Sequence, residues 1–206
     1  MKTVLILLAG ILLGVLATVL GGWLYMNHVM ATIAESPQTT VPLDAEGRVA
    51  QSRRAYRDAN DGYGRWLALT DGVIWSVDVD PPAKTREDAN TVLSVAEKYR
   101  SDWNYGNAVH KAHLALGRLA LRNGDIEQAK HFLIEAGKTP GSPQLNSFGP
   151  NMLLAKELLE KGETAAVLEY LDLCGKFWRS DFGSLSTWKK LIVEGKQPNF
   201  LANLFY

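Results

Sequence analysis

The pattern of hydrophobic and polar residues changes character once, close to the N-terminus. Residues 4–26 form an uncharged run of 23 residues, in which Thr18 carries the only strongly polar side chain. As a helix this run would be roughly 35 Å long, enough to cross a hydrocarbon core about 30 Å thick. A cleaved secretory signal is the alternative, although its apolar core would be shorter, about 7–15 residues. We therefore predict an uncleaved transmembrane signal-anchor over residues 1–27.

The charges beside this run predict its orientation. Lys2 and the α-amine precede the run, whereas residues 27–46 contain three acidic residues and no Lys or Arg. Positive charges close to a membrane span tend to stay in the cytoplasm. The N-terminus is therefore expected in the cytoplasm, and the rest of the chain in the periplasm or extracellular space.

One face of the predicted anchor carries small residues at every fourth position. They are Gly10, Gly14, Thr18 and Gly22. This spacing lets two membrane helices approach closely, so it would suit a homodimer, but glycine is also common in membrane helices that do not pair. Both interpretations stay open at the sequence level.

After the anchor, the apolar spacing becomes that of amphipathic helices. Residues 28–48 contain two prolines and no apolar period, so they are predicted to be a linker, followed by a helical domain over residues 49–206. A helix interrupted near Gly62 and Gly64 is expected over residues 49–69, and another helix after Thr85, a suitable N-cap. Residues 73–79 have strand-like composition in a run too short for periodicity to assign.

The clearest organisation is a repeated helical hairpin. The first hairpin is expected to join helices over about 105–122 and 126–136 at Gly124, and the second to join helices over about 151–160 and 164–177 at Gly162. The two glycines lie 38 residues apart, a period typical of helical-hairpin solenoids. A degenerate hairpin over residues 63–99 would complete the three that a continuous core usually needs. A helix within residues 182–206 would cap the stack.

Matched small and large residues in the two hairpins resemble the packing positions of a tetratricopeptide repeat. In the first hairpin these are Leu116, Gly117, Ala120, Gly124, Ala129, Leu133 and Ala136. In the second they are Leu154, Ala155, Leu158, Val167, Leu171 and Cys174. The segments W-N-Y-G-N-A-V-H from Trp103 and G-S-P-Q-L-N-S-F-G-P-N-M from Gly141 are similar to a group of bacterial tetratricopeptide-like proteins. The resemblance implies an all-α, short tetratricopeptide-like solenoid behind an inner-membrane anchor, and it implies no particular activity.

Composition excludes several classes of function. Lys and Arg number 22, as do Asp and Glu, so the formal net charge is zero and a nucleic-acid partner is not expected. The single cysteine, Cys174, rules out an intramolecular disulfide and a cysteine-rich zinc site. His110 and His113 are three residues apart on one helix, but zinc needs three or four protein ligands. We predict no metal, no cofactor and no catalytic residue.

A cluster of polar and aromatic residues at the starts of two helices is the candidate binding site. Its members are Trp103, Asn104, Tyr105, Asn107, His110, Asn146, Ser147 and Asn151. Asparagine side chains suit the amide groups of an extended peptide, because they offer both donors and acceptors. The alternative is structural, since Asn104 and Ser147 are also suitable N-cap residues.

These patterns favour a non-catalytic, membrane-anchored protein-interaction or scaffold module of the cell envelope, with a protein or peptide partner. The alternative is a membrane-anchored enzyme or small-ligand receptor with a pocket formed by residues 103–110 and 146–151. The clamp that some tetratricopeptide repeats use for a C-terminal carboxylate is not expected. Lys111 and Arg118 are present, but Ala115 and Leu153 stand where its asparagines would be.

Overall fold

The computed structural model describes residues 20–32 and 44–205. Every regular element in these two ranges is helical, which confirms the all-α class for the described part of the chain. Residues 20–32 form a helix. The elements that follow are α2 (Ala45–Asp58), α3 (Gly62–Val79), α4 (Pro82–Ala96), η1 (Glu97–Tyr99), α5 (Tyr105–Arg122), α6 (Ile126–Gly137), α7 (Pro143–Phe148), α8 (Leu153–Leu159), α9 (Thr164–Cys174), α10 (Ser184–Val193) and η2 (Leu201–Leu204).

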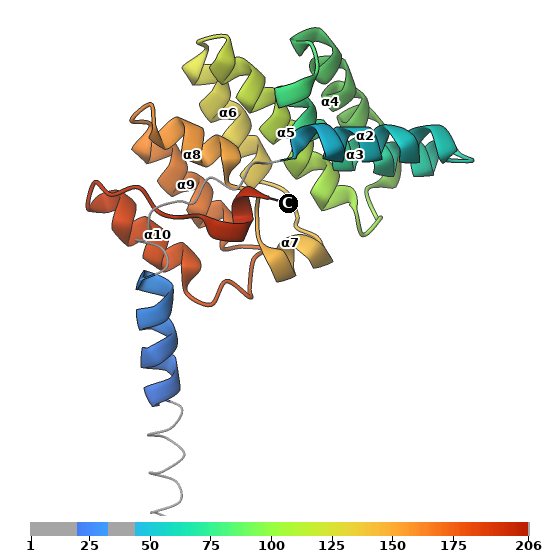
Figure 1. Ribbon diagram of the computed structural model, residues 1–206. Coiled ribbons are helices and arrows are strands. Elements are labelled where there is room, and N and C mark those ends of the chain that lie inside the picture. Colours follow the sequence, from blue (N-terminus) through green and yellow to red (C-terminus); the bar gives the residue numbers. More distant parts are fainter. Residues whose placement is uncertain (1–19, 33–43, 206) are drawn as a thin grey trace, which may run out of the picture.

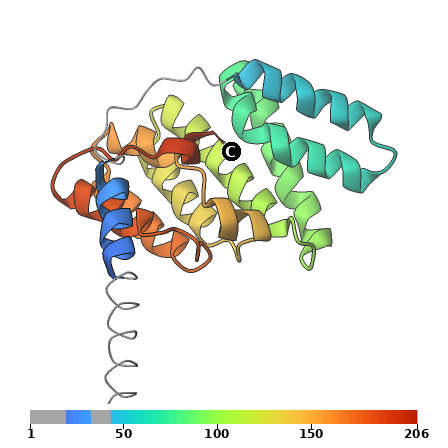
Figure 2. The ribbon, with the colours of Figure 1, turned by 60° about the horizontal axis from the view of Figure 1, so that its bottom comes forward.

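The helices stack in chain order across the domain. α2, α3 and α4 lie at one end, α5 and α6 in the middle, and α8, α9 and α10 at the other end (Figures 1 and 2). α5 packs against α3, α4, α6 and α8, so it is the central helix of the stack. Helix 20–32 projects from the domain beside α10.

Most of the predicted anchor, including Gly10, Gly14 and Thr18, lies outside the described residues. Its last part, residues 20–26, is helical. Among the residues that the structure describes, no helix combines the length and apolarity needed to cross a bilayer. Residues 33–43 of the predicted linker also lie outside the described ranges. α2 begins at Ala45, four residues before the predicted start of the domain, because the Asp44 carboxylate accepts a hydrogen bond from the Gly47 amide at 2.8 Å and caps the helix.

The two predicted hairpin turns are present and have the same geometry. Gly124 and Gly162 have φ angles of +79° and +84°, in the left-handed region that favours glycine. The amide of each glycine donates to the carbonyl three residues earlier, and the following amide donates to the carbonyl five residues before it. The helices around Gly124 have the predicted bounds to within one residue, whereas α8 and α9 are each shorter than predicted.

A third turn of this kind ends α10. Gly195 has a φ angle of +73°, and it and Lys196 repeat the same pair of backbone hydrogen bonds, to Ile192 and Leu191, at 3.0 and 2.9 Å. The chain then returns to the core as an irregular segment, in which Phe200 is fully buried against Trp188. The segment after Gly195 therefore folds back onto the helical stack.

In the N-terminal helices the structure assigns one segment that the sequence left open and corrects one expectation. Residues 73–79 belong to α3, which packs against α2, α4 and α5, and their strand-like composition reflects burial on several sides. The prediction that Thr85 is an N-cap is wrong, because α4 begins at Pro82. The Thr85 hydroxyl is buried and donates to the Ser76 carbonyl at 3.1 Å. Proline suits the first position of a helix because it has no amide hydrogen to leave unsatisfied.

Most of the residues that carry the resemblance to tetratricopeptide repeats are buried between the helices, whereas the turn residue Gly124 is exposed. Ala129, Leu133 and Ala136 of α6 are fully buried, as are Val167 and Leu171 of α9. Small side chains at such positions let neighbouring helices approach, and α6 packs directly against α9. The core therefore runs continuously from the first of these hairpins to the second.

Candidate functional site

The connection between α6 and α8 folds against the start of α5. The Thr139 hydroxyl donates to the Gly106 carbonyl at 2.8 Å, and a Cβ atom on Gly106 would lie 1.8 Å from the Gly141 carbonyl oxygen. Only a residue without a side chain fits there. This close approach brings two of the predicted site segments together, because α7 follows Gly141 directly.

Asn107 is the centre of the polar contacts between α5 and this connection. Its amide nitrogen donates to the Asn104 side-chain oxygen at 2.7 Å and to Gln144 Oε1. Its amide oxygen accepts from the Ser142 hydroxyl at 2.7 Å, and that hydroxyl also caps α7 by accepting from the Leu145 amide at 3.0 Å. Asn107 is thus held by groups of its own chain. Gln144 and Ser142 are site residues that sequence reasoning missed, although Ser142 followed by Pro143 has the pattern of a helix start.

His110 links three segments through its ring. Nδ1 lies 3.1 Å from the Ala136 carbonyl, and Nε2 accepts from the Asn151 amide at 3.1 Å. A carbonyl can only accept, so the proton is on Nδ1 and the ring is neutral. Burial lowers the pKa of His110 to about 4. The same contacts occupy both nitrogens, which leaves neither of them for a metal.

Asn151 has a structural position beneath the pocket. Its side-chain oxygen accepts from the Leu153 amide at 2.9 Å at the start of α8, and its carbonyl accepts from the Tyr170 hydroxyl at 3.0 Å. These contacts favour the capping interpretation for this residue. Asn104 occupies the N-cap position of α5 but makes no capping hydrogen bond with its side chain.

The remaining predicted residues are more scattered. Asn146 Oδ1 accepts from the Arg179 amide at 3.2 Å, in the loop before α10. Ser147 is exposed within α7, so it is not an N-cap. Trp103 is 50 % exposed in the turn before α5, and Tyr105 is half-buried.

A pocket of about 340 Å³ lies between α5 and α7. It is lined by Asn107, His110, Lys111, Gln144, Leu145, Phe148, Gly149 and Asn151. The structure thus brings together three of the eight predicted residues, Asn107, His110 and Asn151, and adds an apolar wall. Phe148, in that wall, is 60 % exposed. Lys111 at its edge forms an ion pair with Asp71 of α3 at 3.0 Å.

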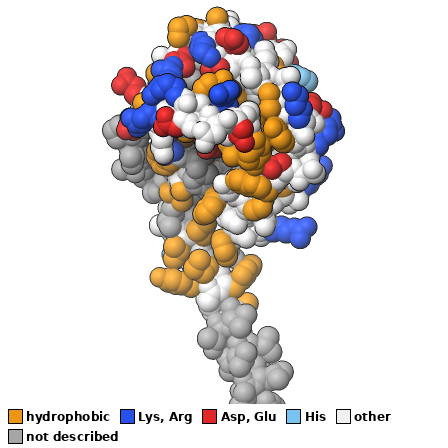
Figure 3. Space-filling model, turned by 90° about the vertical axis from the view of Figure 1, so that its right-hand side faces the viewer, with side chains coloured by type: hydrophobic (Ala, Val, Ile, Leu, Met, Phe, Trp, Pro, Cys, Tyr) orange, Lys and Arg blue, Asp and Glu red, His pale blue; other side chains and the backbone are white. Residues whose placement is uncertain are grey.

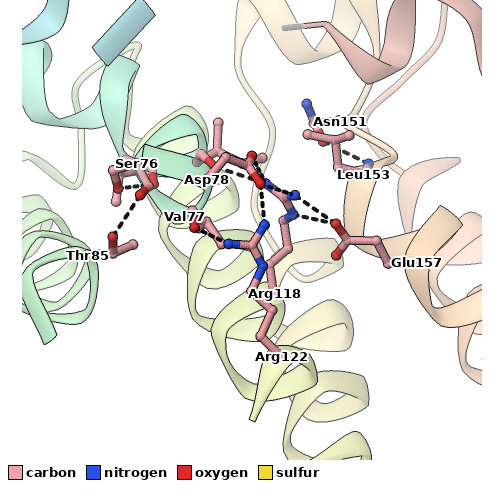
Figure 4. Close-up of polar contacts among 11 residues, drawn as sticks. Ser76, Val77, Asp78, Thr85, Arg118, Arg122, Asn151, Leu153 and Glu157 are labelled. Atoms are coloured by element: carbon pink, nitrogen blue, oxygen red, sulfur yellow. Dashed lines mark hydrogen bonds and ion pairs between the residues drawn. The ribbon is translucent and has the colours of Figure 1, made fainter. Parts of the chain in front are cut away.

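A buried arginine next to this region was not recognised from the sequence as a structural centre. Arg118 of α5 is 4 % exposed, and all five of its N–H groups have acceptors (Figure 4). Nε and Nη2 donate to Glu157 of α8 at 2.9 and 2.7 Å. Nη1 and Nη2 donate to Asp78 of α3 at 2.9 and 3.1 Å. Nη1 also donates to the Ile74 carbonyl of α3 at 3.2 Å. One side chain therefore joins three helices.

The charges around Arg118 shift one another's protonation. Burial alone would raise the pKa of Asp78, but hydrogen bonds from Arg118 and Arg122 outweigh it and hold that pKa below its usual range. Burial opposes the charge of Arg118, yet Glu157 and Asp78 raise its pKa overall. Lys111 and Arg118 are thus already paired with acidic groups of α3.

The two titratable side chains that line the pocket, His110 and Lys111, are both engaged in contacts within the chain. The neutral His110 has a pKa well below 7, and Lys111 is ion-paired. Cys174 is fully buried, and burial raises the pKa of its thiol, which is the opposite of what a nucleophile requires. In the described part of the chain, no three His, Cys, Asp or Glu side chains are arranged to hold a metal ion.

None of the protein-family models, curated proteins or solved structures with which the chain was compared matches it.

Proposed function

We propose that the chain is a membrane-anchored, tetratricopeptide-like interaction module that binds an extended segment of another cell-envelope protein at the pocket between α5 and α7. The observation that carries the proposal is Phe148, which is 60 % exposed in the wall of a pocket whose other wall carries amide groups. Burying a side chain of this size in a complex would gain about 1.5–3 kcal/mol. The hydrogen bond between Asn107 and Gln144 would keep α5 and α7 in place beside Phe148.

The second candidate is a small-ligand receptor at the same pocket. Its support is the volume of about 340 Å³, which lies within the range of pockets that hold small molecules. An enzyme is less well supported, because His110 is neutral with both nitrogens occupied and Lys111 is neutralised by Asp71.

The membrane anchor is part of the proposal and rests on the uncharged run at residues 4–26 and on Lys2 before it. A reporter that is active only outside the cytoplasm should be active when it is fused after Tyr206. The protein should also stay in the inner membrane at full length. A mature N-terminus near Glu35 would show that the N-terminal segment is cleaved. That result would contradict the anchor but not the export of the domain.

The tetratricopeptide-like assignment is supported by the matched turns at Gly124 and Gly162 and by the buried small residues of α6 and α9. Because helix starts and turns in such stacks lie on common edges, a partner segment could extend from the pocket along the starts of neighbouring helices.

Site-specific crosslinking tests the binding site. A photo-reactive amino acid at position 148 should crosslink to one defined protein in cells, whereas the same group at Val193, which is 73 % exposed on α10, should not. With the purified partner segment, Phe148→Ala should weaken binding by about 2 kcal/mol, roughly thirty-fold, as for other central aromatic contacts. Equal crosslinking from both positions would contradict the proposed site. A small molecule that co-purifies with the full chain and is lost in Phe148→Ala would favour the receptor instead.

A further inference from the structure

Helix 20–32 presents an unusual amount of apolar surface. Its exposed large side chains are Leu20, Trp23, Leu24, Tyr25 and Met26, each between 48 % and 68 % exposed. Figure 3 shows hydrophobic side chains around this helix below the domain. All five residues lie at the C-terminal end of the uncharged run 4–26.

The domain contributes a further exposed aromatic residue at the same level. Phe182, in the loop between α9 and α10, is 73 % exposed. This loop lies beside helix 20–32 in both ribbon views (Figures 1 and 2). A hollow between the two is lined by Gly22, Trp23, Met26 and Asn27 on one side and by Phe182, Gly183 and Ser186 on the other.

The loop holds Phe182 outward in a defined conformation. Its φ angle is +48°, a left-handed conformation that is unfavourable for a residue with a side chain. The Asp181 carbonyl accepts from the Ser184 amide at 2.9 Å, and the Asp181 carboxylate accepts from the Leu185 amide at 3.2 Å. The start of α10 thus fixes the loop, while the ring itself stays in solvent.

We propose that Phe182, Trp23 and Met26 form one lipid-contacting surface, on which the domain rests against the outer leaflet of the membrane that anchors it. The proposal depends on the membrane anchor described under the proposed function. Residues 22–27 would lie where the apolar run ends, and this is the depth at which hydrocarbon meets the headgroups. Phe182 faces the same residues and therefore lies at that depth.

The chemistry of the surface favours lipid over a protein partner. Tryptophan and tyrosine are enriched at the membrane–water interface, where an apolar ring and a polar group are both accommodated. Arg179, three residues before Phe182, is also exposed, and a guanidinium suits phosphate headgroups. The anchor would hold this surface at the bilayer permanently, so even weak lipid contacts would be made.

The proposal also gives the binding pocket a location. In both ribbon views α7 lies at the end of the domain from which helix 20–32 projects. A segment bound between α5 and α7 would therefore be held close to the membrane.

Spin labels on the full chain test the contact in vesicles of phosphatidylethanolamine and phosphatidylglycerol. Single cysteines would replace Phe182, Arg179 and, as the control at the other end of α10, Val193. Cys174 is fully buried and should stay unlabelled, which the unsubstituted chain would verify. Relative to the label at 193, the label at 182 should lose most of its collisions with a water-soluble nickel chelate and gain collisions with oxygen. The label at 179 should lie between them.

Three results would overturn the proposal. If the labels at 182 and 193 meet the nickel chelate equally while the protein resists alkaline extraction, the anchor stands and lipid docking fails. If protection at 182 appears only at high protein-to-lipid ratios, a second copy covers the surface instead of lipid. If alkali extracts the protein from the vesicles, both the anchor and the docking fail.

Discussion

Gly117 of α5 offers the sharpest test of how the helices pack. A Cβ atom on this residue would lie 2.3 Å from a methyl carbon of Leu154 and 3.1 Å from Cβ of Phe132. Leu154 is fully buried, so its methyl group cannot move into solvent. Overpacking of this kind costs about 1–3 kcal/mol, whereas alanine gains about 0.5–1 kcal/mol over glycine within a helix. We expect Gly117→Ala to destabilise the chain by about 1–2 kcal/mol, and Gly117→Leu by more.

Urea unfolding of the full chain in a mild detergent, followed by near-ultraviolet circular dichroism, would measure the change. The matched control is Gly62→Ala at the start of α3, where no heavy atom lies within 4 Å of the added Cβ, so little or no loss is expected. Leu154→Ala should cost less in the Gly117→Ala background than in the unsubstituted chain, because it removes the obstructing methyl group. If Gly117→Ala is as stable as the Gly62→Ala control, the close contact between α5 and α8 is wrong.

Four further outcomes follow from the site. Arg118→Met should lower the free energy of unfolding in urea by about 2–4 kcal/mol, because Glu157 loses the cation that pairs with it here and Asp78 keeps only Arg122. Arg118→Lys should recover only part of this loss. The free energy of unfolding should fall by about 2 kcal/mol between pH 7 and pH 5. In the unfolded chain the His110 imidazole gains a proton in this range, whereas in the folded chain burial keeps its pKa at about 4 and the ring stays neutral. His110→Gln should remove that part of the pH dependence in melts at the two pH values. Asn107→Ala should lower the melting temperature, and the free energy of unfolding should fall by about 1–3 kcal/mol, because the change leaves buried polar partners without a hydrogen bond. The affinity for the partner should fall only in proportion to the fraction of folded protein. A chelator should change neither melting nor binding, since His110 already uses both ring nitrogens.

The fold was largely predictable wherever apolar spacing and a turn glycine coincide. α5 has the predicted bounds because its apolar period ends at Asn123-Gly124, which is also where the helix ends. Residues 73–79 were ambiguous, since a helix buried between three others contains the same β-branched residues as a strand. Thr85 was assigned wrongly because its residue type fits both a cap and a buried helix position. Only the packing of α3 against α4 distinguishes these two roles.

The candidate site was predictable only in part. Sequence reasoning placed the start of α5 near the start of α8, and the pocket does contain Asn107, His110 and Asn151. It missed Ser142 and Gln144, because a loop rich in Pro and Gly does not indicate which of its polar side chains turn inward. The contact between His110 and residue 151 uses a backbone amide, which any residue except proline would supply.

Arg118 also has a mechanical consequence. In stacks of helical hairpins each hairpin usually contacts only its neighbours, and small rotations between hairpins add up along the stack. In this domain the planar guanidinium of Arg118 joins α3, α5 and α8 directly. Bending the stack between α3 and α8 would break several of its hydrogen bonds together. The part of the domain between α3 and α8 should therefore resist bending as a single unit.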